Sequence, residues 1–391
     1  MTDLRILCVA GCRPNFVKLG PVIREMRRHA SIHPLLVHTG QHYDHDLSGV
    51  FFRDLELPRP DVKLAVGSGS QAVQTARAME GLESALVEHH PDLVLVVGDV
   101  NSTVAAALTA VKLGIPVAHV EAGLRSFDRE MPEEINRLVT DTISDFLFAT
   151  EPSAVENLHR EGIAAKRVWF VGNVMVDALL SSLDRISASD VLERLGLQAR
   201  GYAVVTLHRA ENVDDPLAAG SLVEALEGLL GLVEVAFPVH PRTRERLHST
   251  GLLRRLEDAP GLRLLDPLGY LDFLKLVKEA SLVATDSGGL QEECTVLGVP
   301  CLTMRDGTER PCTVIQGTNR IVGKTPAAIV DAALRAVSGG WGTAGPPDLW
   351  DGHAAERIVG ALLENTDEIK GRYRGLRGRA LSCGRTRASA A

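Results

Sequence analysis

Short runs of apolar and β-branched residues alternate with helical patterns along most of this 391-residue chain. Examples are RILCVAG, DLVLVVGD and IPVAHVEAG in the first half, and YAVVTLHR, SLVATDSGG and VPCLTM in the second. Strands buried on both faces give such continuous runs, and helices between them imply parallel pairing. Because the chain is too long for one ordinary core, we expect two doubly wound α/β domains in tandem.

The predicted domain boundaries follow the change from one run of strands to the next. We expect an N-terminal Rossmann-like domain over residues 1–173 and a C-terminal one over residues 174–352. Residues 353–391 are predicted to begin with a helix that packs back toward the N-terminal domain. The basic, small-residue-rich tail after it is expected to be disordered.

Composition excludes several classes of partner. The formal net charge of -8 leaves no basic footprint for nucleic acid. The N-terminal apolar run is too short for a signal peptide, and nothing later approaches a membrane span. The 6 cysteines show neither a CxxC pair nor zinc-like spacing, which favours free thiols, a cytoplasmic location and no metal site.

Polar residues stand directly after many of the apolar runs. In open α/β sheets ligands bind beyond the carboxyl ends of strands, so we expect these residues to line a cleft between the two domains. The strand-end residues are Arg13, Lys18, Gln41, His42, Asp99, Glu121, His208, Arg209, His240, Asp286 and Ser287. Each alone has an ordinary explanation, such as Asp99 capping a helix, but their number on both domains indicates a functional site.

Two strand-to-helix junctions favour anion binding. In ATDSGGLQEE, Ser287, Gly288 and Gly289 let the backbone approach an anion at a helix N-terminus, although a plain capped helix would read similarly. Glu293 lies one turn further, where its carboxylate suits ribose hydroxyls. In GCRPNFVKLGPV, the cations of Arg13 and Lys18 suit a pyrophosphate. Neither junction has a GxGxxG pattern, so no nicotinamide cofactor is expected.

The stretch HVEAGLRSFDREMPEEINR gathers four glutamates, one aspartate and three arginines directly after an apolar strand. Its helix begins near Pro132, and its spacing predicts a buried stripe that includes Ile135. Glu133 and Arg137 would then lie on the opposite face, where an ordinary solvated ion pair also explains them. Glu121, however, ends a buried-looking strand, where a carboxylate is costly without a partner or ligand. The residues of this stretch alone leave both a surface loop and a site that moves protons open.

Taken together and in order, these motifs resemble the non-hydrolysing UDP-N-acetylglucosamine 2-epimerases. Further matching motifs are VVGDVNST, TLHRAEN, PVHPR and MRDGTERP, and the resemblance covers about residues 5–323. It implies the GT-B architecture, with two Rossmann-like domains, an active site in the cleft between them, and neither nicotinamide nor metal. Family members interconvert UDP-GlcNAc and UDP-ManNAc by anti-elimination of UDP to 2-acetamidoglucal and re-addition, while the C2 proton exchanges with solvent.

The resemblance also implies roles for individual residues. Asp99, Glu121 and Glu133 would be the acids at the sugar, His208 would assist the departing phosphate, and Arg137 would orient the acids. The UDP would be held by Arg13, Lys18, His240, Ser287, Gly288, Gly289, Glu293 and Arg310. Family habit implies a homodimer that makes precursors of cell-surface polysaccharide.

Some features depart from the family pattern. Cys12 and Asn15 replace residues of the more usual GTRPEAIK motif. Some bacterial members bind a second, activating UDP-GlcNAc through a Gln-His pair and an Arg-Gln pair. Here Gln41 and His42 are present, but the second pair reads Ser70-Gln71, which disfavours activation.

Several readings of the activity stay open at this point. The substrate is UDP-GlcNAc or a uronate or amino derivative of it. A hydrolysing epimerase that releases ManNAc and UDP, a GT-B glycosyltransferase and a catalytically silent UDP-sugar binding protein remain alternatives. The crowd of acids argues against the transferase, because transfer to a hydroxyl needs fewer of them.

Overall fold

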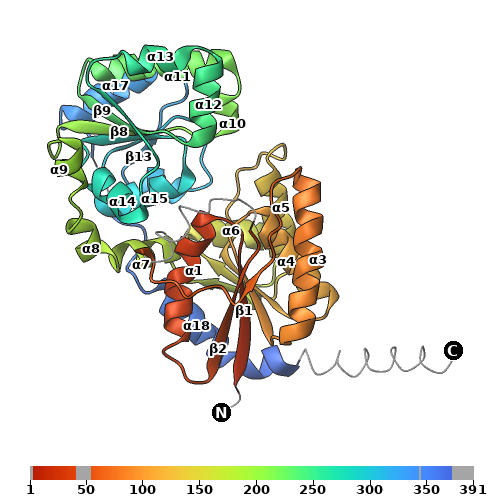
Figure 1. Ribbon diagram of the computed structural model, residues 1–391. Coiled ribbons are helices and arrows are strands. Elements are labelled where there is room, and N and C mark those ends of the chain that lie inside the picture. Colours follow the sequence, from red (N-terminus) through yellow and green to blue (C-terminus); the bar gives the residue numbers. More distant parts are fainter. Residues whose placement is uncertain (1–2, 41–53, 343–344, 372–391) are drawn as a thin grey trace, which may run out of the picture. The chain divides into compact units, whose positions relative to one another are not determined.

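The computed structural model describes residues 3–40, 54–342 and 345–371, which form two compact units (Figure 1). Unit 1 contains the chain up to Ala178 together with the segment that starts at Asp351, and unit 2 is Leu179–Trp350. The chain therefore leaves unit 1 within helix α7 (Val174–Leu180) and returns to it near the C-terminus. The tail predicted to be disordered lies outside the described residues.

Unit 1 is built on a seven-stranded sheet in the order β3-β2-β1-β4-β5-β6-β7, and all of its neighbouring strands are parallel. Its strands are β1 (Leu4–Ala10), β2 (Ile32–His38), β3 (Val62–Lys63), β4 (Leu93–Val97), β5 (Val117–Ala122), β6 (Phe146–Ala149) and β7 (Val168–Phe170). Its helices include α1 (Arg13–Met26), α3 (Gln71–His89), α4 (Asn101–Lys112), α5 (Pro132–Ile143), α6 (Pro152–Arg160) and α18 (Ala354–Glu364). The strand order reverses between β1 and β4, which is where such sheets bind ligands.

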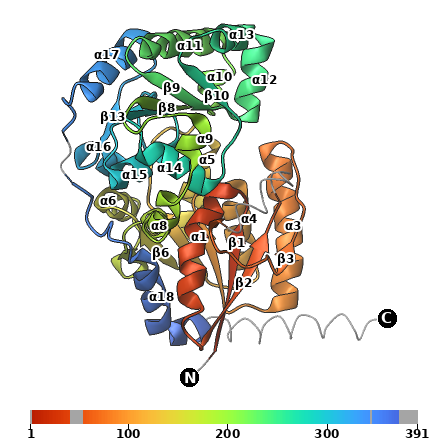
Figure 2. The same cartoon turned by 60° about the vertical axis from the view of Figure 1, so that its left-hand side comes forward.

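Unit 2 has a six-stranded parallel sheet in the order β10-β9-β8-β11-β12-β13 (Figure 2). Its strands are β8 (Tyr202–Thr206), β9 (Glu234–Pro238), β10 (Leu262–Leu265), β11 (Leu282–Thr285), β12 (Cys301–Thr303) and β13 (Asn319–Ile321). Its helices include α8 (Leu183–Ser187), α9 (Val191–Leu195), α10 (Ala210–Val213), α11 (Pro216–Leu230), α12 (Pro241–Ser249), α13 (Leu252–Glu257), α14 (Tyr270–Lys278), α15 (Gly288–Leu297), α16 (Pro311–Ile315) and α17 (Pro326–Val337). The strand order reverses between β8 and β11.

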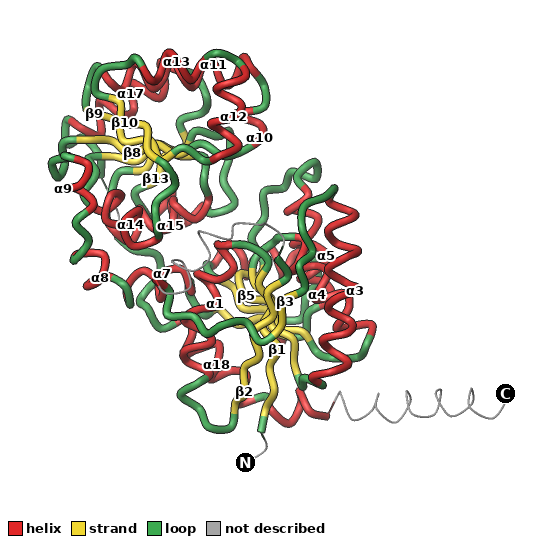
Figure 3. The backbone as a smooth tube through the Cα atoms, viewed as in Figure 1, coloured by secondary structure: helices red, strands yellow, loops and turns green. Residues whose placement is uncertain are grey.

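Both sheets are sandwiched between helices, which explains the continuous apolar runs (Figure 3). In unit 1, α1 packs with α18, while α4 packs with both α3 and α5. In unit 2, separate core clusters form around Leu226 and Val235 and around Leu276 and Val283. All five residues of β4 are buried. The prediction of two doubly wound α/β sheets is confirmed.

The predicted buried stripe of α5 was wrong. The helix buries Glu134, Arg137, Thr140 and Asp141, whereas the side chain of Ile135 is 37% exposed. Burying charged groups is tolerated here because each buried charge on this helix has a partner of opposite charge inside unit 1. The helix therefore presents its polar face to the interior of the unit.

The C-terminal helix α18 is fastened to unit 1 by hydrogen bonds as well as by packing. The carboxylate of Asp177 accepts the backbone N–H of Ala354 at 3.2 Å and that of Ala355 at 2.7 Å. Arg357 donates to the carbonyl of Val171 at 3.1 Å. The amides at the start of α18, which have no partner within the helix, are thus satisfied by a residue distant in sequence. None of the helices in the described residues is long and apolar enough to cross a membrane.

Candidate functional site

Asp99 follows β4 after a turn whose backbone conformation favours glycine. Gly98 has φ of +65°, and a Cβ there would lie 3.1 Å from Lys18 Nζ. Asp99 does not cap α4, because the N-cap position is Val100. Its carboxylate pairs with Arg137, and its carbonyl accepts Asn136 Nδ2 at 2.9 Å. Asp99 is therefore held by α5 at the carboxyl end of the sheet.

Glu121 is buried and adopts an unusual backbone conformation. Its φ is +70°, and the pairing of β5 with β6 shifts register between Val120 and Ala122. Strict alternation would direct Glu121 to the same face as His119, which contacts α5. The bulge instead turns it to Lys18 of α1, with Oε2 and Nζ 2.5 Å apart. A non-glycine residue in this region costs about 1 kcal/mol or more, so the surrounding contacts must maintain it.

The first turn of α5 carries two adjacent glutamates with different surroundings. Glu134 is buried, accepts the backbone N–H groups of Ser126 and Phe127 at 2.9 and 3.1 Å, and pairs with Arg137 at 3.0 Å. Glu133 is half-buried. The ion pairs of Arg137 go to Asp99 and Glu134, so this arginine links the strand-end acid to the loop before the helix.

The start of α1 holds the two cations of the first anion-binding junction. Arg13 is the first residue of the helix and is half-buried, and Pro14 suits this first turn. The side chain of Asn15 accepts the N–H of Gly11 at 3.0 Å and donates to the carbonyl of Val97 at 3.1 Å. Asn15, which departs from the common family motif, thus ties the loop after β1 to β4.

In unit 2, His208 follows β8 and is oriented by a buried aspartate. Its Nδ1 lies 2.7 Å from an oxygen of Asp286, which also accepts the N–H of Arg209 and the amide of Asn212, each at 3.0 Å. Burial raises the pKa of Asp286, but His208 and these hydrogen bonds outweigh it and hold the pKa at about 2. The sequence marked Asp286 as a strand-end residue but did not reveal this role.

The N-terminus of α15 forms a cradle next to Arg310. Ser287 is the N-cap, Gly288 and Gly289 are the first helical residues, and a Cβ on Gly288 would collide with the guanidinium of Arg310. Arg310 Nε donates to Glu292 Oε1 at 2.6 Å. Exposed helical N–H groups, a close cation and the absence of a side chain favour a bound anion at this point.

Two further predicted residues of unit 2 have distinct environments. Burial, together with the charge of neighbouring Glu292, raises the pKa of Glu293 to about 8, so its carboxyl group is protonated at neutral pH. His240 is the N-cap of α12, and its Nδ1 accepts the N–H of Arg242 at 3.3 Å.

The structure thus assembles the predicted residues into two sets, each at the carboxyl ends of one sheet. Gln41 and His42 lie outside the described residues, and Gln71 is exposed at the start of α3. Among the described residues there is no group of three or more His, Cys, Asp or Glu side chains suited to a metal ion.

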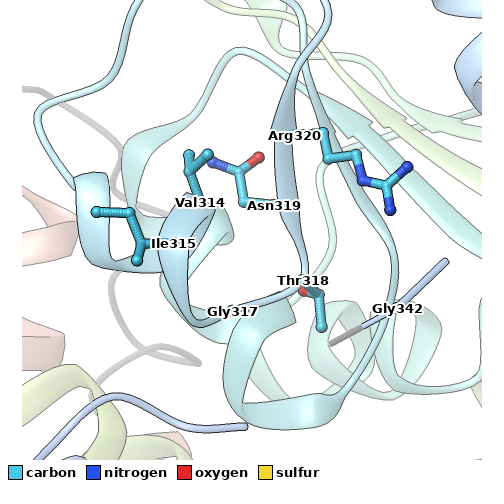
Figure 4. A pocket seen from close by; sticks show the side chains of 7 residues that line it. All are labelled: Val314, Ile315, Gly317, Thr318, Asn319, Arg320 and Gly342. Atoms are coloured by element: carbon cyan, nitrogen blue, oxygen red, sulfur yellow. The ribbon is translucent and has the colours of Figure 1, made fainter. Parts of the chain in front are cut away.

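A separate pocket of about 330 Å³ lies in unit 2 (Figure 4). Its lining is Val314, Ile315, Gly317, Thr318, Asn319, Arg320 and Gly342. The guanidinium of Arg320 stacks over the ring of Trp341 at 3.9 Å. This lining has no carboxyl, imidazole or thiol group, so it offers nothing for proton transfer.

Comparisons with known proteins agree with this geometry. The family model described as UDP-N-acetylglucosamine 2-epimerase matches residues 24–363. The chain is 43% identical over 335 residues to the UDP-N-acetylglucosamine 2-epimerase of Methanocaldococcus jannaschii, covering 84% of this chain and 91% of the relative. It is 42% identical over 334 residues to the UDP-2,3-diacetamido-2,3-dideoxy-D-glucuronate 2-epimerase of Pseudomonas aeruginosa, with the same coverage.

Solved structures give the same picture. The crystal structure of the Methanocaldococcus jannaschii enzyme in complex with UDP-GlcNAc and UDP superimposes with a TM-score of 0.86 at 41% identity, covering 92% of this chain and all of that one. A sucrose-phosphate synthase from Thermosynechococcus elongatus, at 13% identity and a TM-score of 0.57, shares the fold alone. The two parallel sheets are those of a GT-B-like fold.

Proposed function

Because the chain belongs to the UDP-N-acetylglucosamine 2-epimerase family, we propose that it inverts the configuration at C2 of UDP-GlcNAc or of a closely related UDP-sugar. The observation that carries the proposal is the pair of ion-paired carboxylates at neighbouring strand ends, Asp99 with Arg137 and Glu121 with Lys18. Carboxylates held in this way at a ligand-binding edge suit the transfer of a proton at carbon.

The first step is the elimination of UDP. A carboxylate removes the proton from C2, the electron pair of that bond forms the C1–C2 double bond, and the C1–O bond breaks. The oxygen leaves with UDP, and the sugar becomes 2-acetamidoglucal. The departing diphosphate gains charge, and we expect the N-terminus of α15, Arg310 and His208 to stabilise it.

The second step reverses the first on the other face of the sugar. The UDP oxygen adds to C1 again, and a carboxylic acid delivers a proton to C2 from the opposite side. Two faces require more than one acid, which fits the presence of Asp99, Glu121 and Glu133. The strained backbone of Glu121 supports a role for this residue at the reacting carbon, since strain of this kind is concentrated at functional positions.

The substrate is proposed as a class. The relatives named for UDP-N-acetylglucosamine and for a diacetamido-glucuronate match this chain at 43% and 42% identity, so identity alone favours neither sugar. Glu293, protonated at neutral pH, suits a hydrogen bond with a ribose hydroxyl common to both substrates. The family resemblance further supports a homodimer in the cytoplasm. Sedimentation at micromolar concentration tests whether the protein is a dimer.

Proton NMR of the purified protein with UDP-GlcNAc in D2O tests the proposal. We expect deuterium at C2 of the substrate and growing signals of UDP-ManNAc, while UDP-2,3-diacetamido-2,3-dideoxy-glucuronate serves as the second substrate. Asp99→Asn and Glu121→Gln should each lower the rate by at least about 100-fold, because the amide cannot take up the proton.

Other outcomes separate the alternatives. Accumulation of free ManNAc and UDP would identify a hydrolysing enzyme. Unchanged signals with both UDP-sugars over hours would contradict an epimerase, and transfer of the sugar to an added hydroxyl acceptor would then establish a transferase.

A further inference from the structure

A fully buried histidine, His119, contacts the residue before Asp99 and lies two residues before Glu121 on β5. The ring of His119, on β5, has Nδ1 at 2.7 Å from Asp141 Oδ1 and Nε2 at 2.8 Å from the backbone carbonyl of Gly98. A carboxylate oxygen and a carbonyl oxygen both accept hydrogen bonds, so the ring lies between two acceptors. The ring is therefore held at both ends, between α5 and the turn after β4.

Asp141 makes a second set of contacts from the same carboxylate. Its Oδ2 accepts the N–H of Gly123 at 3.0 Å and pairs with Arg125 at 2.7 Å. Arg125 continues to Glu161 through bonds of 2.6 and 2.7 Å. Burial raises the pKa of Asp141, but His119 and Arg125 lower it by more, so the pKa lies below its ordinary value and the carboxylate is ionised.

These contacts hold the two turns that carry Asp99 and Glu121. Gly98, at φ of +65°, directly precedes Asp99, and Gly123, at φ of +84°, lies two residues after Glu121. The two turns are also linked to each other by the N–H of Gly98, which donates to the carbonyl of Val120 at 3.0 Å. The pair formed by His119 of β5 and Asp141 of α5 thus contacts both turns.

We propose that His119, together with Asp141, is a positioning residue that sets the placement of Asp99 relative to Glu121. The proposal rests on the function proposed above, since it assigns those two acids to the reaction. His119 contacts the carbonyl of Gly98, and Asp141 accepts the N–H of Gly123. The contact between His119 and Asp141 therefore connects the two turns. Catalytic groups must be held to within about 0.5 Å, and a misplacement of about 1 Å costs on the order of 100-fold in rate.

Two substitutions at the same position separate this role from simple stability. The amide nitrogen of asparagine takes the place of Nδ1, so His119→Asn keeps a donor toward Asp141 and loses the one toward Gly98. The longer glutamine places its amide near Nε2, so His119→Gln keeps the donor toward Gly98 and removes the partner of Asp141 Oδ1, while Asp141 Oδ2 keeps Arg125. Both variants are compared by Tm, by kcat and KM in the NMR assay, and by UDP affinity.

Positioning predicts opposite orders of stability and activity. We expect His119→Gln to have the lower Tm but the higher kcat, and His119→Asn to be more stable yet slower than the wild type by about 10- to 100-fold. KM and UDP affinity should change by no more than about twofold, because the residues proposed to hold UDP in unit 2 are untouched. If kcat follows Tm across the two variants, or if both retain the wild-type kcat, the proposal is overturned.

A third variant covers the case in which the His119 variants do not fold. Asn157 donates to the carbonyl of Gly123 at 3.0 Å, and its removal leaves no buried charge unpaired. Asn157→Ala should lower kcat with KM unchanged, and a wild-type kcat would contradict the proposal. The proposed function is tested separately, by the turnover of the wild-type protein. A wild type without turnover would overturn that function, and this inference with it, before any variant is compared.

Discussion

At the scale of single residues, the charged groups at the carboxyl edges of the two sheets are arranged in pairs, and each pair contains at least one buried side chain. In unit 1, Glu121 faces Lys18 and Asp99 faces Arg137, and in unit 2, Asp286 faces His208. Taking one carboxylate from water costs several kcal/mol, so each must be compensated by a cation or hydrogen bonds. Glu293 is the exception, because the charge that raises its pKa further, beside the effect of burial, belongs to another carboxylate, Glu292.

Glu293 predicts a specific dependence of stability on pH. Its pKa is raised from 4.5 to about 8, so the folded protein holds a proton that the unfolded chain releases above pH 4.5. The contribution of this side chain to stability is therefore complete below pH 4.5 and is lost as pH rises through 8, at about 1.4 kcal/mol for each pH unit between the two values. Glu293→Gln cannot ionise and should show a smaller fall in Tm between pH 5 and pH 9.

Thermal unfolding of both proteins across that range measures the difference. Glu257→Gln, at an ordinary surface glutamate that ends α13, is the matched control and should behave as the wild type. Parallel curves for wild type and Glu293→Gln would contradict the raised pKa.

At the scale of elements, the ends of helices and one irregular strand shape the proposed site. The N-terminus of α15 provides free N–H groups, and the bulge in β5 redirects Glu121 from the α5 side of the sheet to Lys18. Regular helices and strands alone would leave these groups without their present partners. Gly288 determines the position of Arg310 at this helix start, because a Cβ at residue 288 would collide with the guanidinium.

Substitution of that glycine should weaken UDP binding. In Gly288→Ala the new Cβ displaces the guanidinium of Arg310, so we expect UDP affinity to fall by about 10-fold or more, as for the loss of a charge-assisted contact. Isothermal titration with UDP measures it. Gly220→Ala is the control, since that position in α11 opens onto space with nothing within 4 Å.

The control carries its own expectation. Alanine within a helix is favoured over glycine by about 0.5–1 kcal/mol, so Gly220→Ala should raise stability slightly while UDP affinity is unchanged. Equal UDP affinities of Gly288→Ala and wild type would show that Arg310 does not act at the cradle.

At the scale of the whole molecule, the chain passes from unit 1 to unit 2 and back again. The return depends on α18, whose first N–H groups are accepted by Asp177 just before the chain enters unit 2. The carboxylate of Asp177 thus joins the segment just before unit 2 to the segment just after it. Burial raises the pKa of this carboxyl group, while the hydrogen bonds from Ala355 and Ala354 oppose the rise.

Removal of that carboxylate should loosen α18 before the rest of unit 1. Asp177→Ala eliminates both hydrogen bonds, with an expected cost of about 1–2 kcal/mol. Hydrogen exchange followed by mass spectrometry should therefore quicken over Ala354–Glu364 while β4 stays protected. Asp184→Ala, at an exposed aspartate on the neighbouring helix α8, should change neither. Faster hydrogen exchange throughout unit 1, or unchanged exchange over α18, would contradict the proposal that Asp177 holds α18 in place.

Much of the fold was predictable because hydrophobic burial leaves a periodic signal in the sequence. The run DLVLVVGD became β4, with every residue of the strand buried and Asp99 just beyond its end. The same reasoning failed for α5, where Glu134, Arg137 and Asp141 face inward and Ile135 outward. Periodicity assumes that charged residues face water, and the ion pairs that make the opposite arrangement stable join residues far apart along the chain.

The sequence by itself therefore determined two parallel α/β sheets, the edges at which their polar residues gather, and membership of the epimerase family through ordered motifs. Only the tertiary structure decided the partners: that Glu121 turns to Lys18, that Arg137 joins Asp99 to Glu134, and that His119 and Asp141 brace two turns. The physical reason is range. Apolar spacing records local secondary structure, whereas the pairing of buried charges depends on distances that exist only once strands and helices have packed.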